Sequence, residues 1–197
     1  MNDKIKEIKQ SFRLMMDGSI AQSMRDKGVD YHLNWGATLP RLRQKADEIG
    51  KNYDLAIALW KENDRECKIL ATMIMPADEI LPEVVDIWME QTDTIEIAEQ
   101  AAMNLYQYLP YAPEKAYQWI ASERELYQLC GFHVLSRLFM IGQEPNERGI
   151  NEFLDQAHVA LQSESIIVRK AALNSINHFS NLGLVYERLA GSILRRL

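Results

Sequence analysis

Apolar residues recur along this chain at the three- and four-residue spacing of amphipathic helices, and the strict alternation of half-buried strands is nearly absent. Ala, Leu, Met, Glu, Gln, Lys and Arg dominate the composition, and all of them favour helix. The pattern predicts ten to twelve helices. The candidate segments are residues 3–16, 19–26, 38–49, 53–61, 64–74, 78–90, 93–109, 113–121, 123–140, 146–161, 165–179 and 181–196.

Several of these segments begin with residues that commonly start helices. Thr38 is expected to be an N-cap, and Pro40 would then fall in the first turn, where its missing N–H costs nothing. Further start signals are Asp64, Pro82, Thr92–Asp93 ahead of Glu96, Pro113, and Ser122 ahead of Glu125.

Paired helices without a central heptad pattern favour a stack in which each pair buries its apolar face against the next. We therefore expect an all-α, right-handed α-solenoid, with a compact helical bundle as the alternative. At 197 residues, and with no Gly-, Ser- or Pro-rich linker, residues 1–197 are predicted to form a single domain.

Composition narrows the classes of protein to consider. The first seven residues are polar and charged, and no apolar run approaches the roughly 20 residues that span a bilayer, so we expect a cytoplasmic protein without membrane contact. Cys67 and Cys130 are isolated and are expected to be buried thiols. The four histidines lie far apart in sequence, so neither a metal site nor a cofactor is predicted.

The net charge of −6 argues against a simple nucleic-acid binder, but the charge is unevenly distributed. Residues 1–75 hold 13 basic and 11 acidic side chains (net +2), residues 76–125 hold 2 and 11 (net −9), and residues 126–197 hold 7 and 6 (net +1). Acidity is therefore concentrated in the middle, and both ends retain side chains suited to phosphate.

Two basic pairs are the candidate phosphate contacts. Arg41 and Arg43 follow Pro40 near the start of a predicted helix, and Arg169 and Lys170 lie side by side in the predicted helix 165–179. A helix N-terminus and a cationic helix face both suit anions. The alternative for Arg169 and Lys170 is a solvated face beside a packed seam.

The order and spacing of three motifs resemble those of the DNA alkylation repair enzyme family, the AlkD-like alkylpurine DNA glycosylases built from HEAT-like repeats. The motifs are Gly36-x-x-x-Pro40-x-Leu42-Arg43, Leu59–Trp60 with Arg65–Glu66, and Val168-Arg169-Lys170-Ala171. The resemblance extends from about Gly18 to the end of the chain. It implies a fold of HEAT-like repeats and a concave groove that binds DNA.

The same resemblance implies an active site that this chain matches only in part. Aligned by motif, the family's catalytic carboxylate corresponds to Glu96, one methylene longer than the family's Asp. Its two aromatic walls correspond to Thr92 and Asn174, and its arginine to Leu129. Trp88 is one turn from Thr92, but a packed core position suits it better. Glu96 itself has an alternative explanation, either a capping box with Thr92 or Asp93 or simple exposure to water.

Other catalytic arrangements have less support in the sequence. Cys130 and His133 are three residues apart, but no third group to orient them is evident. The tyrosines around the turn at 110–113 suit packing between repeats better than base stacking.

The sequence therefore predicts a monomeric DNA-binding protein of this family whose alkylpurine glycosylase activity is weak or lost. Glu96 is its candidate catalytic residue, and Arg41, Arg43, Arg169 and Lys170 are its candidate DNA contacts. The alternative is a non-enzymatic helical-repeat scaffold that binds a protein partner or branched DNA.

Overall fold

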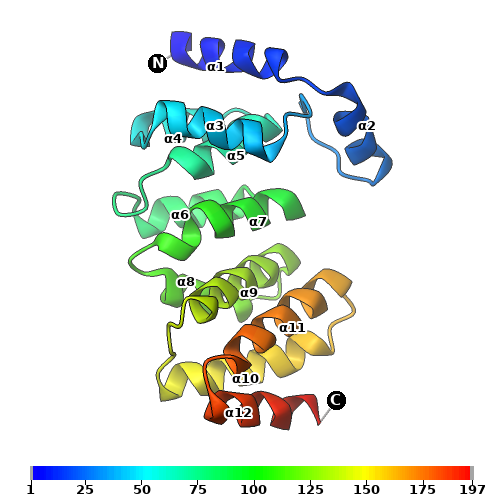
Figure 1. Ribbon diagram of the computed structural model, residues 1–197, viewed down its shortest axis with the longest axis vertical. Coiled ribbons are helices and arrows are strands. Elements are labelled where there is room, and N and C mark those ends of the chain that lie inside the picture. The colour runs from blue at the N-terminus through cyan, green and yellow to red at the C-terminus, as the bar shows by residue number, and fades with distance from the viewer. Residues whose placement is uncertain (1, 196–197) are drawn as a thin grey trace. The chain divides into compact units, whose positions relative to one another are not determined.

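The computed structural model describes residues 2–195, and within them twelve α-helices and one short 3-10 helix follow one another (Figure 1). The helices are α1 (Asn2–Leu14), α2 (Gly18–Asp26), α3 (Leu39–Ile49), α4 (Tyr53–Trp60), α5 (Arg65–Ile74), α6 (Pro82–Glu90), α7 (Ile95–Asn104), the 3-10 helix η1 (Tyr106–Tyr108), α8 (Ala112–Ile120), α9 (Glu125–Met140), α10 (Glu147–Leu161), α11 (Ile166–Ser180) and α12 (Leu184–Leu194). The only β-type pairing within this range is an isolated parallel bridge between Leu33 and Asp64.

Every predicted helical segment contains a helix, and within the described residues three of the predicted bounds differ from the observed ones by three residues or more. The segment 78–90 becomes helical only at Pro82, because a residue that precedes proline is driven out of the α region, and Leu81 is extended (ψ 149°). The segment 93–109 breaks after Asn104 and continues as η1. The segment 181–196 begins only at Leu184, because Gly183 (φ 154°) is not helical.

Side-chain caps account for several helix starts. Asn52, Asn146 and Ser165 each accept a hydrogen bond from a backbone N–H in the first turn of the helix that follows. Thr38 occupies the predicted N-cap position of α3, and Pro40 lies in the first turn, although the Thr38 side chain makes no capping bond.

The described contacts cluster into two compact units, one that ends at Gln100 and one that begins at Ala101. The single domain expected for residues 1–197 remains a prediction.

The first unit is organised around α5, which is buried along nearly its whole length. Helices α3 and α4 pack on α5, and α1 packs on α4. The indole rings of Trp60 and Trp88 stack with centroids 4.2 Å apart and planes 4° from parallel. Both side chains are buried, so Trp88 is a core residue, as predicted.

The second unit has its core where α9 packs against α8 and α11. Rings of Phe132, Phe139, Phe153 and Phe179 contact one another there, with centroid distances between 4.9 and 6.4 Å.

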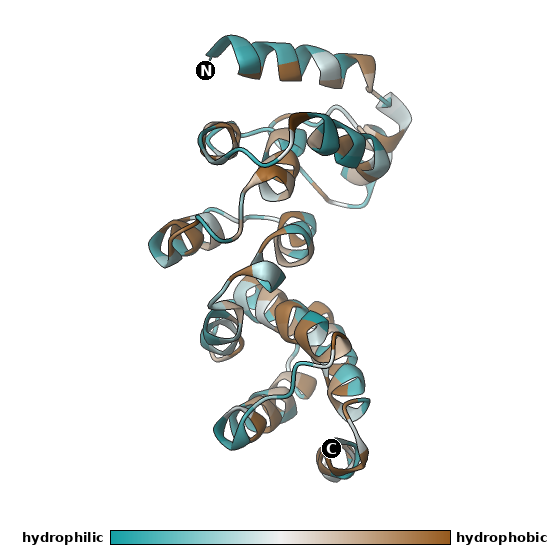
Figure 2. Ribbon diagram, turned by 60° about the vertical axis from the view of Figure 1, so that its left-hand side comes forward, coloured by the Kyte–Doolittle hydropathy of each residue, from teal (hydrophilic) through white to brown (hydrophobic). Residues whose placement is uncertain are grey.

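The amphipathic pattern predicted from the sequence is visible in the helices of both units. Many helices carry hydrophobic residues (brown) on one side and hydrophilic residues (teal) on the other (Figure 2).

The predicted all-α class is therefore confirmed. Cys67 and Cys130 are both buried thiols and form no disulfide, as expected. Between residues 2 and 195, every helix is too short or too polar to cross a bilayer.

Candidate nucleic-acid interface

Glu96, the candidate catalytic carboxylate, lies in the first turn of α7 and forms a two-pronged ion pair with Arg65 of α5. Arg65 Nε donates to Glu96 Oε2 at 2.8 Å, and Arg65 Nη2 donates to Oε1 at 2.6 Å. The arginine side chain is 2% exposed and the glutamate side chain 22%. This bidentate geometry fixes the orientation of both side chains, because each of two guanidinium nitrogens donates to a different carboxylate oxygen.

Tyr31 contributes a third hydrogen bond to the same carboxylate. Its hydroxyl donates to Glu96 Oε2 at 2.6 Å. Burial acts to raise the pKa of Glu96, but the hydrogen bonds and charge of Arg65, together with the Tyr31 hydroxyl, outweigh burial and lower it. The pKa of Tyr31 is raised, by burial and by the charge of Glu96. Glu96 is therefore ionised and fully engaged at neutral pH.

The neighbouring Glu66 ties the segment before α3 to this ion pair. Glu66 accepts hydrogen bonds from the backbone N–H groups of Trp35 (3.2 Å) and Ala37 (3.1 Å) and from Arg65 Nη1 (3.0 Å). Arg65 Nη1 also donates to the Ala37 carbonyl at 2.9 Å. Arg65, Glu66 and Glu96 thus form a charged network that holds the loop in place.

The predicted alternatives for Glu96 are wrong, because this side chain neither completes a capping box nor simply faces water. Thr94 supplies the capping oxygen, which accepts from the Ile97 N–H at 3.3 Å. The Thr92 hydroxyl instead donates to the Trp88 carbonyl at 2.8 Å. Glu96 is held by Arg65, and this partner was recognised in the sequence only as part of the Arg65–Glu66 motif.

The residues that the motif resemblance aligned with the family's aromatic walls and arginine are Thr92, Asn174 and Leu129, and the structure shows where each of them lies. Thr92 is 4% exposed, and Trp88, the possible substitute, is 2% exposed and stacked on Trp60. Leu129 is buried in the core of the second unit. Asn174 lies on the surface of α11 and donates to Ser136 Oγ at 2.9 Å.

The four candidate phosphate contacts lie on two helices, one in each unit. Arg41 and Arg43 are exposed on α3, and Arg41 Nη1 donates to the Met15 carbonyl at 3.2 Å. On α11, Lys170 is exposed, whereas Arg169 turns back and donates to the carbonyls of Ser163 and Glu164. Of the α11 pair, Lys170 is therefore the residue that presents its charge to solvent.

Helices α9 and α11 together present a polar surface in the second unit, which we call the α9–α11 face. The two helices lie side by side, since Asn174 bonds Ser136 and the rings of Phe179 and Phe139 pack 5.4 Å apart. The residues that define the face are Arg137 and Met140 on α9 and Lys170, Leu173, Asn174, Asn177 and His178 on α11.

Carboxylates are nearly absent from these two helices. Glu125, in the first turn of α9, is the only acidic residue in either, and the Ser165 hydroxyl donates to it. Arg137 is held in place because its Nε donates to Gln107 Oε1 at 3.2 Å and its Nη1 lies 4.0 Å from the Met140 sulfur. An acidic protein thus carries one pair of packed helices with three basic residues, Arg137, Arg169 and Lys170, and one carboxylate, Glu125.

Two residues of these sites, Arg137 and Tyr31, were not predicted from the sequence. Arg137 had a detectable signal, because it lies four residues after His133 on the polar stripe of an otherwise apolar helix. Tyr31 had none, since it lies 65 residues from Glu96 in the chain.

Comparison with known proteins now places the chain in a class. Residues 8–181 match the family described as DNA alkylation repair enzyme. The match covers most of the sequence, so the chain belongs to the DNA alkylation repair enzyme family, as the motifs predicted.

One solved structure is similar across nearly the whole chain. It is described as belonging to "a new family of proteins related to the HEAT-like repeat DNA glycosylases with affinity for branched DNA structures". The TM-score is 0.85 at 17% sequence identity, with 96% of this chain and 81% of the other covered. The likeness confirms the fold of HEAT-like repeats. No curated protein sequence matches this chain at a significant level.

Proposed function

We propose that the protein binds DNA through the α9–α11 face, prefers branched DNA, and has little or no alkylpurine glycosylase activity. The observation that carries the proposal is the charge of that face. Arg137 and Lys170 project from two adjacent helices in which Glu125 is the only carboxylate, within a chain of net charge −6. Phosphate contacts need a cation at an approximate position, and this face supplies two, with a single carboxylate, at the start of α9, on the two helices.

The amides beside these cations suit the same ligand. Asn177 is exposed one turn beyond Leu173, and Asn174 lies between Lys170 and Asn177 along α11. Side-chain amides commonly donate to phosphate and sugar oxygens, and such contacts position a protein on DNA without reading the sequence. We therefore expect shape rather than base sequence to govern binding.

The preference for branched DNA rests on the similar solved structure, whose family is described as having affinity for branched DNA. Membership in the DNA alkylation repair enzyme family supports a DNA ligand independently of that structure.

Two features of the candidate active site, the ion pair of Glu96 and the residues at positions 92 and 174, support weak or absent excision. The carboxylate of Glu96 is neutralised by Arg65, so a developing positive charge on a sugar would have to compete with a bidentate guanidinium. No aromatic side chain occupies position 92 or 174 to hold an alkylated base.

Arg41 and Arg43 are the proposed DNA contacts of the first unit. In the second unit, Arg169 is proposed as a DNA contact beside Lys170. We further propose that the protein acts as a monomer. The Arg169 side chain also stabilises the turn before α11, because its Nη1 donates hydrogen bonds to the carbonyls of Ser163 and Glu164.

The test is a titration of the protein against a continuous duplex, a mismatched duplex and a three-way junction at two salt concentrations. We expect the junction to bind most tightly and all three affinities to fall as salt rises. Equal affinity for junction and duplex would remove the branched preference, and no binding at the lower salt concentration would overturn the proposal as a whole.

A further inference from the structure

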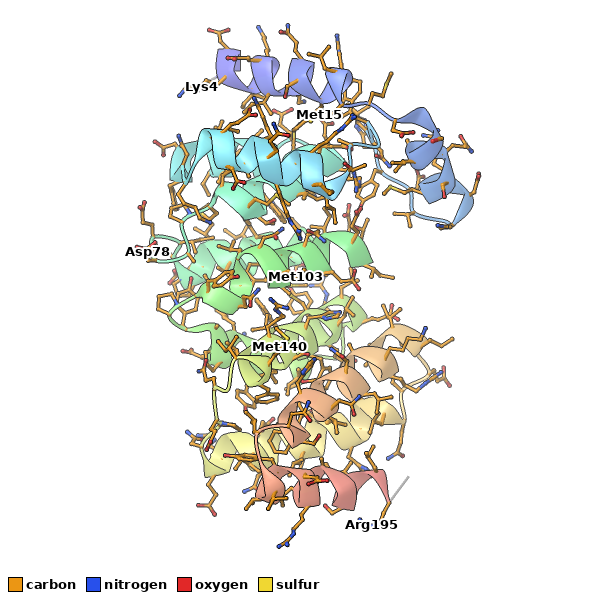
Figure 3. The ribbon with its side chains drawn as sticks, in the orientation of Figure 1. Lys4, Met15, Asp78, Met103, Met140 and Arg195 are labelled. Atoms are coloured by element: carbon orange, nitrogen blue, oxygen red, sulfur yellow. The ribbon has the colours of Figure 1, made fainter. Side chains whose placement is uncertain are left out.

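A hollow of about 480 Å³ opens in the second unit where α9 ends and α11 ends. Met140, labelled in Figure 3, marks the end of α9 beside it. Its apolar lining comes from Phe139, Met140 and Leu182, and its polar lining from Glu144, His178 and Asn181. Phe139 is 4% exposed and packs edge-on against Phe153 and Phe179, so it forms the base of the hollow, and Met140, at 48% exposed, offers the largest apolar surface.

The hollow adjoins the α9–α11 face because Met140 and His178 belong to both. Arg137 lies one turn before Met140 on α9, with its Nη1 against the Met140 sulfur. The guanidinium of Arg137 therefore lies beside one of the residues that line the hollow.

The carboxylate of Glu144 is hydrogen-bonded to Tyr186. The Tyr186 hydroxyl donates to Glu144 Oε2 at 2.8 Å, and the Tyr186 ring packs edge-on against Phe179 at 5.1 Å. The hydrogen bond to Glu144 is the main reason that the pKa of Tyr186 is raised. The second carboxylate oxygen, Oε1, has no protein donor within the described part of the chain. Glu144 is exposed, so this oxygen is available as a hydrogen-bond acceptor at the rim of the hollow.

We propose that this hollow binds one unpaired nucleobase that carries an exocyclic amino group, extruded at the branch point of bound DNA. The inference rests on the proposed function and adds to it the site that would distinguish a branch from a continuous duplex. The base would stack on the apolar wall, donate its amino group to Glu144, and take further hydrogen bonds from Asn181.

The charge of the lining decides between a base and a phosphate. A phosphate would meet the carboxylate of Glu144 at close range and be repelled, whereas an amino group would be attracted. Adenine and cytosine carry such an amino group, and thymine does not. The cations of the adjoining face favour nucleic acid over an acidic peptide as the molecule that supplies the occupant.

The experiment compares three junctions that differ only at one unpaired nucleotide, which is adenine, thymine or an abasic linker. We expect the adenine junction to bind about fivefold to tenfold tighter than the abasic junction, with thymine between them. Equal affinity for adenine and abasic junctions, with junction binding intact, would overturn this inference and leave the proposed function standing. Failure to bind any junction would overturn the proposed function as well.

Two matched variants connect the effect to the hollow. Glu144→Ala should abolish the preference for adenine over thymine, whereas Glu147→Ala removes the same charge from an exposed residue outside the lining and should preserve it. Because the readout is a ratio of two affinities for one protein, a general change in electrostatic attraction cancels. A preference that survives Glu144→Ala would overturn the role of this carboxylate in selecting the base.

Discussion

Arg65 engages both carboxylate oxygens of Glu96, at 2.8 and 2.6 Å, across the packed helices of the first unit. This relationship accounts for two properties that are otherwise unrelated. It anchors the loop before α3 through Glu66, and it engages Glu96, the carboxylate that the motif resemblance proposes as the catalytic acid. Glu96 therefore has a role in the fold, and the proposed loss of excision follows from the same contact.

Replacing Arg65 with Met should destabilise the protein by about 3–5 kcal/mol, because Glu66 is fully buried and would lose its cation. Urea unfolding measures this loss. The control is Arg43→Met, an exposed arginine for which a change within about 0.5 kcal/mol is expected. Similar midpoints for the two variants would contradict the structural role given to the network.

The dependence of stability on pH should report the Glu96 ion pair. Burial raises the pKa of Glu96 and Arg65 lowers it, with a net lowering in the folded state. The stabilisation is therefore fully present above the unfolded pKa of about 4.3, and it is lost as pH falls through the lower folded value. The parent should lose more free energy of unfolding than Glu96→Gln when pH falls from about 5 to about 3. Parallel losses would show that the pair contributes nothing.

Gly36 is expected to be irreplaceable in the loop that Glu66 holds. Its φ is +71°, and a Cβ there would lie 2.1 Å from the Asp17 carbonyl oxygen. Gly36→Ala should therefore cost more than the roughly 1 kcal/mol due to backbone strain alone. Gly50 provides the comparison, because it also has φ +71° but its Cβ would meet no atom within 4 Å. If thermal unfolding shifts equally in both alanine variants, the close approach at Gly36 carries no cost.

Sequence patterns predicted the fold more fully than the site. Every helix was foreseen because apolar spacing and capping residues are local signals, and the misplaced bounds fall where the chain departs from the helix at Leu81, Asn104 and Gly183. The motifs also placed the chain in its family.

Local sequence signals could not predict the contacts around Glu96. Tyr31, Arg65 and Glu96 meet only because the chain folds back over 31 and 65 residues, and no spacing rule encodes such a meeting. The turn of Arg169 toward Ser163 was missed for a different reason, since a basic residue in the first turn of a helix is equally able to face solvent or its own backbone.

Excision of alkylated purines should be undetectable or very slow. The assay is single-turnover release of N7-methylguanine and N3-methyladenine with protein in excess over alkylated duplex DNA. Parent and Glu96→Gln should behave alike, because the carboxylate is already neutralised by Arg65. Robust release by the parent that the variant abolishes would show that Glu96 acts as a catalytic residue.

The central claim, that the α9–α11 face holds DNA phosphates, is tested most directly by the salt dependence of binding in two charge-matched double variants. Arg137→Ala with Lys170→Ala removes two cations from the face, and Arg148→Ala with Arg188→Ala removes two exposed cations from α10 and α12. Fluorescence anisotropy on one three-way junction gives the slope of log affinity against log salt. The first variant should flatten that slope by up to about 1.8, at about 0.9 per phosphate, while the second keeps the slope of the parent. Equal slopes for the parent and the Arg137–Lys170 variant would contradict the claim.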